Sequence, residues 1–165
     1  MKKRVLIILM LSIVFGFATG YSLHHWIHSA RFPEEKIMLM PEHPFYLMEE
    51  VNEEVLYNTL KHYDFPSPAI ITAQAVLESG NFKSKLCKDN NNLFGLYNSR
   101  TMSYFKFDSW ISCVFAYKQF ILSRYDPEED YYRFLDRIGY AEDSLYESKV
   151  KELELDIINK YGSPD

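Results

Sequence analysis

The sequence holds few of the residues on which disulfide-rich proteins and metalloproteins depend. Its two cysteines, Cys87 and Cys113, are too few for a disulfide framework; they either pair with each other in an oxidising compartment or remain free, packed thiols. Its five histidines lie beside the apolar N-terminal segment or stand isolated, so the sequence contains no evident ligand set for zinc or calcium. We therefore expect no metal and no other cofactor.

Short motifs of several enzyme and binding classes are missing as well. The six glycines form no phosphate-binding loop, and no Ser-His-Asp or Cys-His arrangement is evident. Basic residues are scarce: removing the first twenty residues takes away three of the 18 and no acidic residue, which leaves 15 against 23 and a formal charge of -8. Because phosphate binding needs a basic face, we expect no nucleic-acid partner.

Apolar and aromatic residues, in contrast, are abundant. The chain of 165 residues is 47% hydrophobic and 16% aromatic. This length suits one compact domain with an appendage. The aromatic content suits either a well-filled core or a groove lined for sugars, and composition alone does not choose between them.

The N-terminus has the pattern of an export signal. Residues 2–4 are basic, residues 5–17 form an uncharged apolar run, and a small-x-small site follows at 18–20. Extended to Leu23, the uncharged run is about long enough to span a bilayer, so residues 1–23 are predicted to be either a signal peptide or an uncleaved membrane anchor. No cysteine follows directly, which argues against a lipoprotein. We expect the protein in the cell envelope, secreted or anchored.

The remaining chain reads as a linker followed by one mostly helical domain. Residues 24–44 contain three prolines and no sustained period, which predicts a linker, and the domain is expected to span residues 45–165. Apolar periodicity predicts helices over 46–63, 68–79, 109–125 and 128–138, a short helical turn over 83–88, a hairpin turning at 98–99, and a last helix with an apolar stripe from 146 to 161.

Capping residues mark the expected helix ends. Ser67 and Pro68 open the second helix and Gly80 ends it. Asp108 is expected to cap the helix over 109–125, Asp126-Pro127 to open the helix over 128–138, and Gly139 to stop it. The last helix is expected to begin at Asp143 or Ser144, where Ser144-x-x-Glu147 fits a capping box.

One glutamate stands alone in an apolar segment. Between Asp64 and Lys83 the only charged residue is Glu78, on the same helical face as Ile71 and one turn after Gln74. Partial desolvation and the negative end of the helix dipole should both raise its pKa, as a general acid requires. The alternative is a glutamate that points to solvent or caps the asparagine turn at 90–92.

Three blocks follow one another along the chain: residues 73–80 (AQAVLESG), residues 91–96 (NNLFGL), and the Gly-Tyr-Ala-x-Asp-x-x-Tyr pattern at 139–146. Together they resemble the glucosaminidase domain of glycoside hydrolase family 73, which is also described as mannosyl-glycoprotein endo-beta-N-acetylglucosaminidase-like and includes bacterial autolysins. The resemblance covers about residues 65–161. Three blocks in order are a specific match.

The resemblance implies a lysozyme-like fold with a groove between a helical lobe and a small hairpin lobe. It implies hydrolysis of the β-1,4 bond on the reducing side of N-acetylglucosamine in peptidoglycan. Glu78 matches the catalytic acid and Tyr140 a tyrosine that lines the cleft; an ordinary packed tyrosine is the alternative for Tyr140. Asp143 is better interpreted as an N-cap than as a catalytic residue. Candidates for contacts with the glycan are Asn92, Phe94, Tyr97 and Tyr104, because amides and aromatic faces bind sugars.

The sequence departs from the family pattern at the second acid. Many members carry an acidic residue in the hairpin, whereas residues 93–107 contain none. Three routes stay open: Asp108 as base, the 2-acetamido group of the substrate as nucleophile, or Glu78 alone, as in the lytic transglycosylases. A catalytically weak domain that binds glycan or recruits a partner is a further alternative, although a binding site needs no lone carboxylate on a buried helix. We predict the hydrolase.

Overall fold

The computed structural model describes residues 50–141 and 143–162. Within them it contains six α-helices, one 3-10 helix and a two-stranded antiparallel sheet. The predicted mostly helical, lysozyme-like domain with a small hairpin is confirmed. The predicted signal or anchor (1–23) and linker (24–44) lie outside the described residues, as do both ends of the predicted domain. Across the part of the chain that is described, no helix has the length and apolar character needed to cross a membrane.

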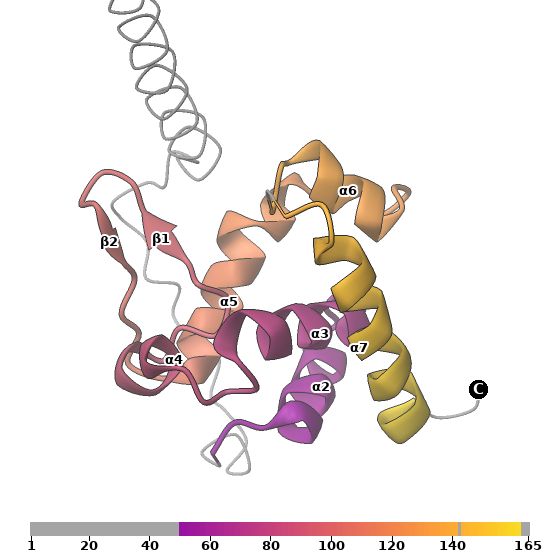
Figure 1. Ribbon diagram of the computed structural model, residues 1–165, viewed down its shortest axis with the longest axis horizontal. Coiled ribbons are helices and arrows are strands. Elements are labelled where there is room, and N and C mark those ends of the chain that lie inside the picture. Colours follow the sequence, from indigo (N-terminus) through magenta and orange to yellow (C-terminus); the bar gives the residue numbers. More distant parts are fainter. Residues whose placement is uncertain (1–49, 142, 163–165) are drawn as a thin grey trace, which may run out of the picture.

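Helix α3 (Pro68–Ser79) runs through the middle of the domain. Nine of its twelve residues are buried, and α2 (Glu53–His62) and α7 (Tyr146–Tyr161) both pack against it (Figure 1). Its bounds are the predicted ones, and Gly80 ends it in the left-handed conformation at φ +58°. Ser67 occupies the N-cap position without a side-chain capping bond, so the proline at the first helical position marks the start.

Helix α2 begins later than predicted. Residues 50–52 are not helical, and residues 46–49 lie outside the described part. The Asn52 side chain accepts a hydrogen bond from the Val55 amide at 2.9 Å, which caps the helix at Glu53. The apolar period upstream of Asn52 does not extend the helix past this cap.

The hairpin lobe follows a short helix. Helix α4 (Lys85–Asn90) begins two residues after the predicted start of the turn at 83, and Ser84 caps it. Strands β1 (Tyr97–Asn98) and β2 (Ser103–Tyr104) then pair antiparallel, with Tyr97 opposite Tyr104. The predicted hairpin is confirmed, but it turns at residues 99–102 instead of 98–99, because Asn98 still belongs to β1.

Three predicted caps in the second half are wrong. Ser109, not Asp108, caps α5 (Trp110–Phe120), and a 3-10 helix, η2 (Leu122–Arg124), takes up the rest of the predicted helix. Asp130, four residues after the predicted opening, caps α6 (Tyr131–Arg137), and Gly139 follows it with φ +60°. Helix α7 starts at Tyr146 without a side-chain cap.

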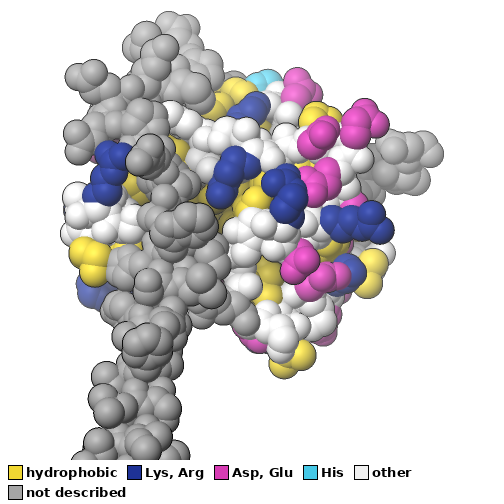
Figure 2. All heavy atoms as spheres, turned by 90° about the horizontal axis from the view of Figure 1, so that it is seen from above, with side chains coloured by type: hydrophobic (Ala, Val, Ile, Leu, Met, Phe, Trp, Pro, Cys, Tyr) yellow, Lys and Arg dark blue, Asp and Glu magenta, His cyan; other side chains and the backbone are white. Residues whose placement is uncertain are grey.

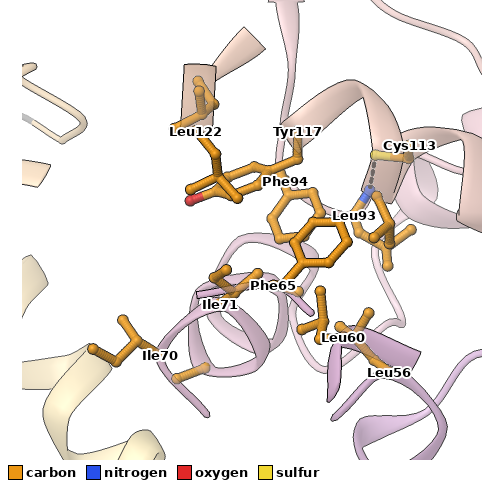
Figure 3. Packing of buried hydrophobic residues seen from close by; sticks show 14 of the residues in the cluster. Leu56, Leu60, Phe65, Ile70, Ile71, Leu93, Phe94, Cys113, Tyr117 and Leu122 are labelled. Carbon is orange, nitrogen blue, oxygen red and sulfur yellow. Dashed lines mark hydrogen bonds between the residues drawn. The ribbon is translucent and has the colours of Figure 1, made fainter. Parts of the chain in front are cut away.

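The core forms where α3, α5 and the loop after α4 meet. Figure 3 shows Phe94 packed against Tyr117 of α5, with Phe65 beside Phe94 and Leu93 beside Cys113. The Leu93 amide donates to the thiol sulfur of Cys113 at 3.3 Å, so this cysteine helps to position the loop. Cys87 and Cys113 are both buried and free. Burial raises the pKa of the Cys113 thiol to about 12.

Charged side chains remain at the surface. Acidic and basic groups are interspersed on the face shown in Figure 2. Exposed ion pairs include Lys149–Asp143 at 2.6 Å and Lys160–Glu53 at 3.0 Å. Exposed ion pairs contribute little to the free energy of unfolding, so the fold is stabilised mainly by the packing around α3.

Candidate active site

Glu78 lies in the last turn of α3, immediately before the chain turns at Gly80. The residue is exposed to solvent, yet the protein atoms around its carboxyl are numerous enough to desolvate it partly. This desolvation raises the pKa of Glu78, and a hydrogen bond from Tyr146 acts in the opposite direction. The direction agrees with the sequence-based expectation. A carboxyl group with a raised pKa, open to solvent on one side, can keep a proton for transfer to a bound molecule.

Four tyrosines form a connected group, and three of them interact with the charge of Glu78. We call Tyr117 (α5), Tyr131 (α6), Tyr140 and Tyr146 (α7) the tyrosine cluster. The ring centroids of Tyr117 and Tyr140 are 6.3 Å apart, and those of Tyr140 and Tyr146 are 5.7 Å apart. The charge of Glu78 contributes to raising the pKa of Tyr117, Tyr140 and Tyr146, after the larger effect of burial. These three members of the cluster therefore lie within electrostatic reach of the carboxyl, and Tyr131 is linked to them through Tyr117.

Gln74 links this cluster together. It is fully buried on α3, one turn before Glu78. Its amide oxygen accepts from the Tyr117 hydroxyl at 2.9 Å, and its amide nitrogen donates to the Tyr146 hydroxyl at 3.2 Å. The Tyr117 and Tyr131 hydroxyls are 3.0 Å apart. Sequence reasoning gave no role to Gln74, although a lone amide on an otherwise apolar helix was a usable signal.

Tyr140 has an unusual hydroxyl group. Its oxygen is the one buried side-chain nitrogen or oxygen within residues 50–141 and 143–162 that has no hydrogen-bond partner. Leaving a buried hydroxyl unpaired costs free energy, so such a group calls for an explanation. A donor near the Glu78 carboxyl is well suited to a sugar hydroxyl, a carbonyl or a water molecule.

The loop after α4 passes close to the carboxyl. A Cβ built on Gly95 would lie 3.8 Å from Oε2 of Glu78, and Gly95 has φ +63°. Glycine adopts this left-handed conformation without strain, and it lets the backbone run beside the acid. The loop thus forms one wall of the site around Glu78.

Asn92 supports this loop from inside. It is 1% exposed. Its amide nitrogen donates to the carbonyls of Leu96 at 2.8 Å and Phe105 at 3.0 Å, and its oxygen accepts from the Leu96 amide at 2.8 Å. The prediction that Asn92 contacts the glycan does not fit this position, because every strong hydrogen-bonding atom of the amide already has a partner within the protein.

Phe94 is likewise placed in the core. It is 4% exposed and its ring centroid lies 4.2 Å from that of Tyr117 (Figure 3). A ring buried in this way cannot stack on a sugar, so the predicted contact with the glycan does not fit either. Phe94 instead supports the Tyr117 ring, whose hydroxyl bonds to Gln74.

Tyr97 and Tyr104 occupy the hairpin lobe. They face each other across β1 and β2 with ring centroids 5.2 Å apart. Tyr104 is 52% exposed and Tyr97 is half-buried, so both offer ring surface to a ligand. They stay candidates for glycan contacts.

The two aspartates considered in the sequence differ in their surroundings. Asp143 is exposed, accepts from the Leu145 amide at 2.9 Å and pairs with Lys149, which holds its pKa below the usual range. It therefore supports the turn before α7 instead of acting as the N-cap itself. Asp108 is exposed and precedes the Ser109 cap of α5. In the described part of the chain, no three His, Cys, Asp or Glu side chains are grouped to hold a metal ion.

Comparison with known proteins gives one match. A family model, Glucosaminidase, described as mannosyl-glycoprotein endo-beta-N-acetylglucosaminidase, matches residues 54–162. This range includes α2 to α7, and with them Glu78, Gly95 and the tyrosine cluster. No curated protein and no solved structure matches the chain.

Proposed function

The chain belongs to the glucosaminidase family, and from this premise we propose that it is an endo-β-N-acetylglucosaminidase that cleaves peptidoglycan. Membership of the family supports a glycoside hydrolase that acts on a glycan of the cell envelope. The finer proposal is that the bond cut is the β-1,4 bond on the reducing side of N-acetylglucosamine.

One observation carries this proposal: a solvent-accessible carboxyl with a raised pKa, Glu78, beside an unpaired buried hydroxyl, that of Tyr140. A raised pKa increases the fraction of Glu78 that is protonated near neutral pH, and the open side gives a glycan access.

In the proposed reaction, Glu78 donates its proton to the glycosidic oxygen as the bond from that oxygen to the anomeric carbon breaks. The bonding electron pair goes to the leaving oxygen, and Glu78 becomes a carboxylate that accepts the hydrogen bond from Tyr146. Water then attacks the anomeric carbon and returns a proton to Glu78. We propose that the Tyr140 hydroxyl, which is buried near Glu78 and has no partner in the described residues, donates to the reacting centre when a glycan is bound.

A second candidate rests on a specific feature of the hairpin. Residues 93–107 contain no aspartate or glutamate, so the hairpin provides no second carboxylate to activate water or attack the sugar. A lytic transglycosylase needs only the one acid, because a hydroxyl of the substrate itself attacks the anomeric carbon and a 1,6-anhydro sugar results. The two reactions share Glu78 and differ in the chemical end that they leave. A non-catalytic glycan-binding domain is the remaining alternative.

The experiment compares release of soluble glycan from purified peptidoglycan by the wild-type full chain, by Glu78→Gln and by Glu152→Gln. Glu152 is an exposed glutamate on α7 and serves as the matched control. We expect Glu78→Gln to lose at least about a hundredfold in rate, since general acid catalysis contributes about 10²–10⁴-fold. Glu152→Gln should retain the wild-type rate. Equal release by wild type and Glu78→Gln would refute the role of Glu78.

The predicted N-terminal signal or anchor completes the proposal. Export would bring the domain to the peptidoglycan, with residues 24–44 as the spacer between a membrane and the domain. Cleavage of the segment would give a secreted enzyme, and its retention an anchored one.

A further inference from the structure

A continuous series of hydrogen bonds leads from the core toward Glu78 and ends at the Tyr146 hydroxyl. It runs from the Tyr131 hydroxyl to the Tyr117 hydroxyl, to the Gln74 amide, and on to the Tyr146 hydroxyl. The Tyr146 hydroxyl interacts with the Glu78 carboxyl, which follows Gln74 by one turn on α3, and this interaction lowers the pKa of Glu78 against the larger effect of burial. The residues come from four helices, α6, α5, α3 and α7, so the series ties together elements that are far apart in the sequence.

The amide of Gln74 sets the direction of every bond in this series. Its oxygen can only accept and its nitrogen can only donate. Because the oxygen accepts from Tyr117, the Tyr117 proton is committed to Gln74, and Tyr131 must be the donor to Tyr117. Because the nitrogen donates to the Tyr146 oxygen, the Tyr146 proton is directed away from Gln74 and is available to Glu78.

We propose that Gln74 and Tyr146 are positioning residues for Glu78, forming a one-way relay in which each donor points toward the carboxyl group. This inference rests on the proposed function only for its effect on catalysis; the relay itself stands on the hydrogen bonds. It provides for Glu78 a fixed donor when the carboxyl has given up its proton. It also fixes the direction in which the carboxyl presents its other oxygen to a glycan.

The relay acts against the effect of burial on Glu78. Titratable groups that interact with its charge are Tyr117 of α5, Tyr140, and Tyr146 of α7. Of these, Tyr146 stabilises the charged form through its hydrogen bond, while desolvation favours the neutral form. Removing the relay should therefore raise the pKa of Glu78 further and leave the carboxyl less well oriented.

The test is a carbon-13 NMR titration of the Glu78 carboxyl in the full chain, in wild type, Tyr146→Phe and Gln74→Met. We expect Tyr146→Phe to move the titration to higher pH, and Gln74→Met to move it in the same direction by less. The alkaline limb of the pH profile of kcat should move in the same direction as the titration. We also expect kcat to fall about tenfold with KM unchanged, because a carboxyl that is less well oriented transfers its proton more slowly.

Tyr132→Phe is the matched control. Its hydroxyl donates to Glu154 at 2.6 Å, between α6 and α7 but outside the relay. We expect its Glu78 titration to equal that of wild type. If Gln74→Met does not fold, Tyr117→Phe interrupts the relay one step earlier and should also shift the titration upward.

An unchanged or lowered titration in Tyr146→Phe would overturn the proposal. That result is expected if the Gln74 amide is turned over, because the Tyr146 proton would then point to residue 74. A shift of equal size in Tyr132→Phe would also overturn it. Failure of the wild-type chain to cleave any glycan would refute the proposed function, while the titration would still decide on the relay.

Discussion

At the residue scale, Glu78 combines exposure with an unfavourable setting for charge. Because its folded-state pKa is raised above the unfolded value of 4.5, ionisation costs stability at neutral pH, and the cost disappears as the pH falls below that unfolded value. We expect Glu78→Gln to be at least as stable as wild type at pH 7. The difference in melting temperature between the variant and wild type should be larger at pH 7 than at acid pH.

Thermal unfolding of both proteins at pH 7 and near pH 4 checks this prediction. The advantage of the glutamine variant should shrink toward acid pH, where the wild-type carboxyl is protonated in both states. A melting temperature that falls sharply in Glu78→Gln at pH 7 would instead identify a structural carboxylate and weaken the case for catalysis.

Replacing Tyr140 is a second way to test stability and activity separately. Its buried hydroxyl has no partner in the described structure, so Tyr140→Phe should be neutral or stabilising, by up to about 1–3 kcal/mol. If the hydroxyl donates at the reacting centre, the same change should lower kcat while KM changes little. Urea unfolding and steady-state kinetics measure the two effects; a loss of stability with unchanged kcat would contradict the assignment.

Single residues also show what a sequence can reveal about the site. Glu78 was identifiable because a lone charge on an apolar helix is conspicuous in the sequence. Asn92 and Phe94 were placed in the groove because their residue types suit sugars, but type does not reveal which way a side chain points in a loop. Tyr117 and Tyr131 were missed as site residues because tyrosines at helical spacing are equally typical of a core.

At the scale of elements, the helices were predicted better than their ends. Apolar periodicity located α3, α5 and α7, since it reflects burial against the rest of the domain. The starts of α2 and α6 depend on which of several polar residues forms the capping bond, and the structure selects Asn52 and Asp130. Neighbouring candidates have equal propensity, so local chemistry alone does not decide among them.

The loop between α4 and β1 should depend on Asn92. Asn92→Ala removes three side-chain bonds to the backbone and takes the partner from the Leu96 amide and the Phe105 carbonyl, whereas the Leu96 carbonyl still accepts from the Phe105 amide at 3.0 Å. We expect a loss of about 2–4 kcal/mol in the free energy of unfolding, since each unpaired buried group costs about 1–3 kcal/mol.

Asn98→Ala is the matched control in the same lobe. Its side chain accepts from the Arg100 amide at 3.0 Å in an exposed turn, so its replacement should cost less than about 1 kcal/mol. Urea unfolding of the two variants tests the comparison. Equal losses would mean that Asn92 does not hold the loop as described.

At the scale of the whole molecule, the family match and the fold describe the same unit. The match covers residues 54–162, and these residues contain every described helix from the second residue of α2 to the end of α7. The three sequence blocks come together in space: Glu78 from the first, Gly95 from the second, and Tyr140 and Tyr146 from the third. Their spacing in the sequence did not reveal this arrangement, which arises because α7 packs along α3.

The central claim is that this domain hydrolyses peptidoglycan with Glu78 as the acid, and mass spectrometry tests it most directly. Purified peptidoglycan is digested with the full chain, reduced with sodium borohydride and analysed, with Glu78→Gln in parallel. We expect fragments from the wild-type chain that end in reduced N-acetylglucosamine, and we expect these fragments to be absent with Glu78→Gln. Fragments ending in anhydro-muramic acid, or no fragments at all from the wild-type chain, would contradict the central claim.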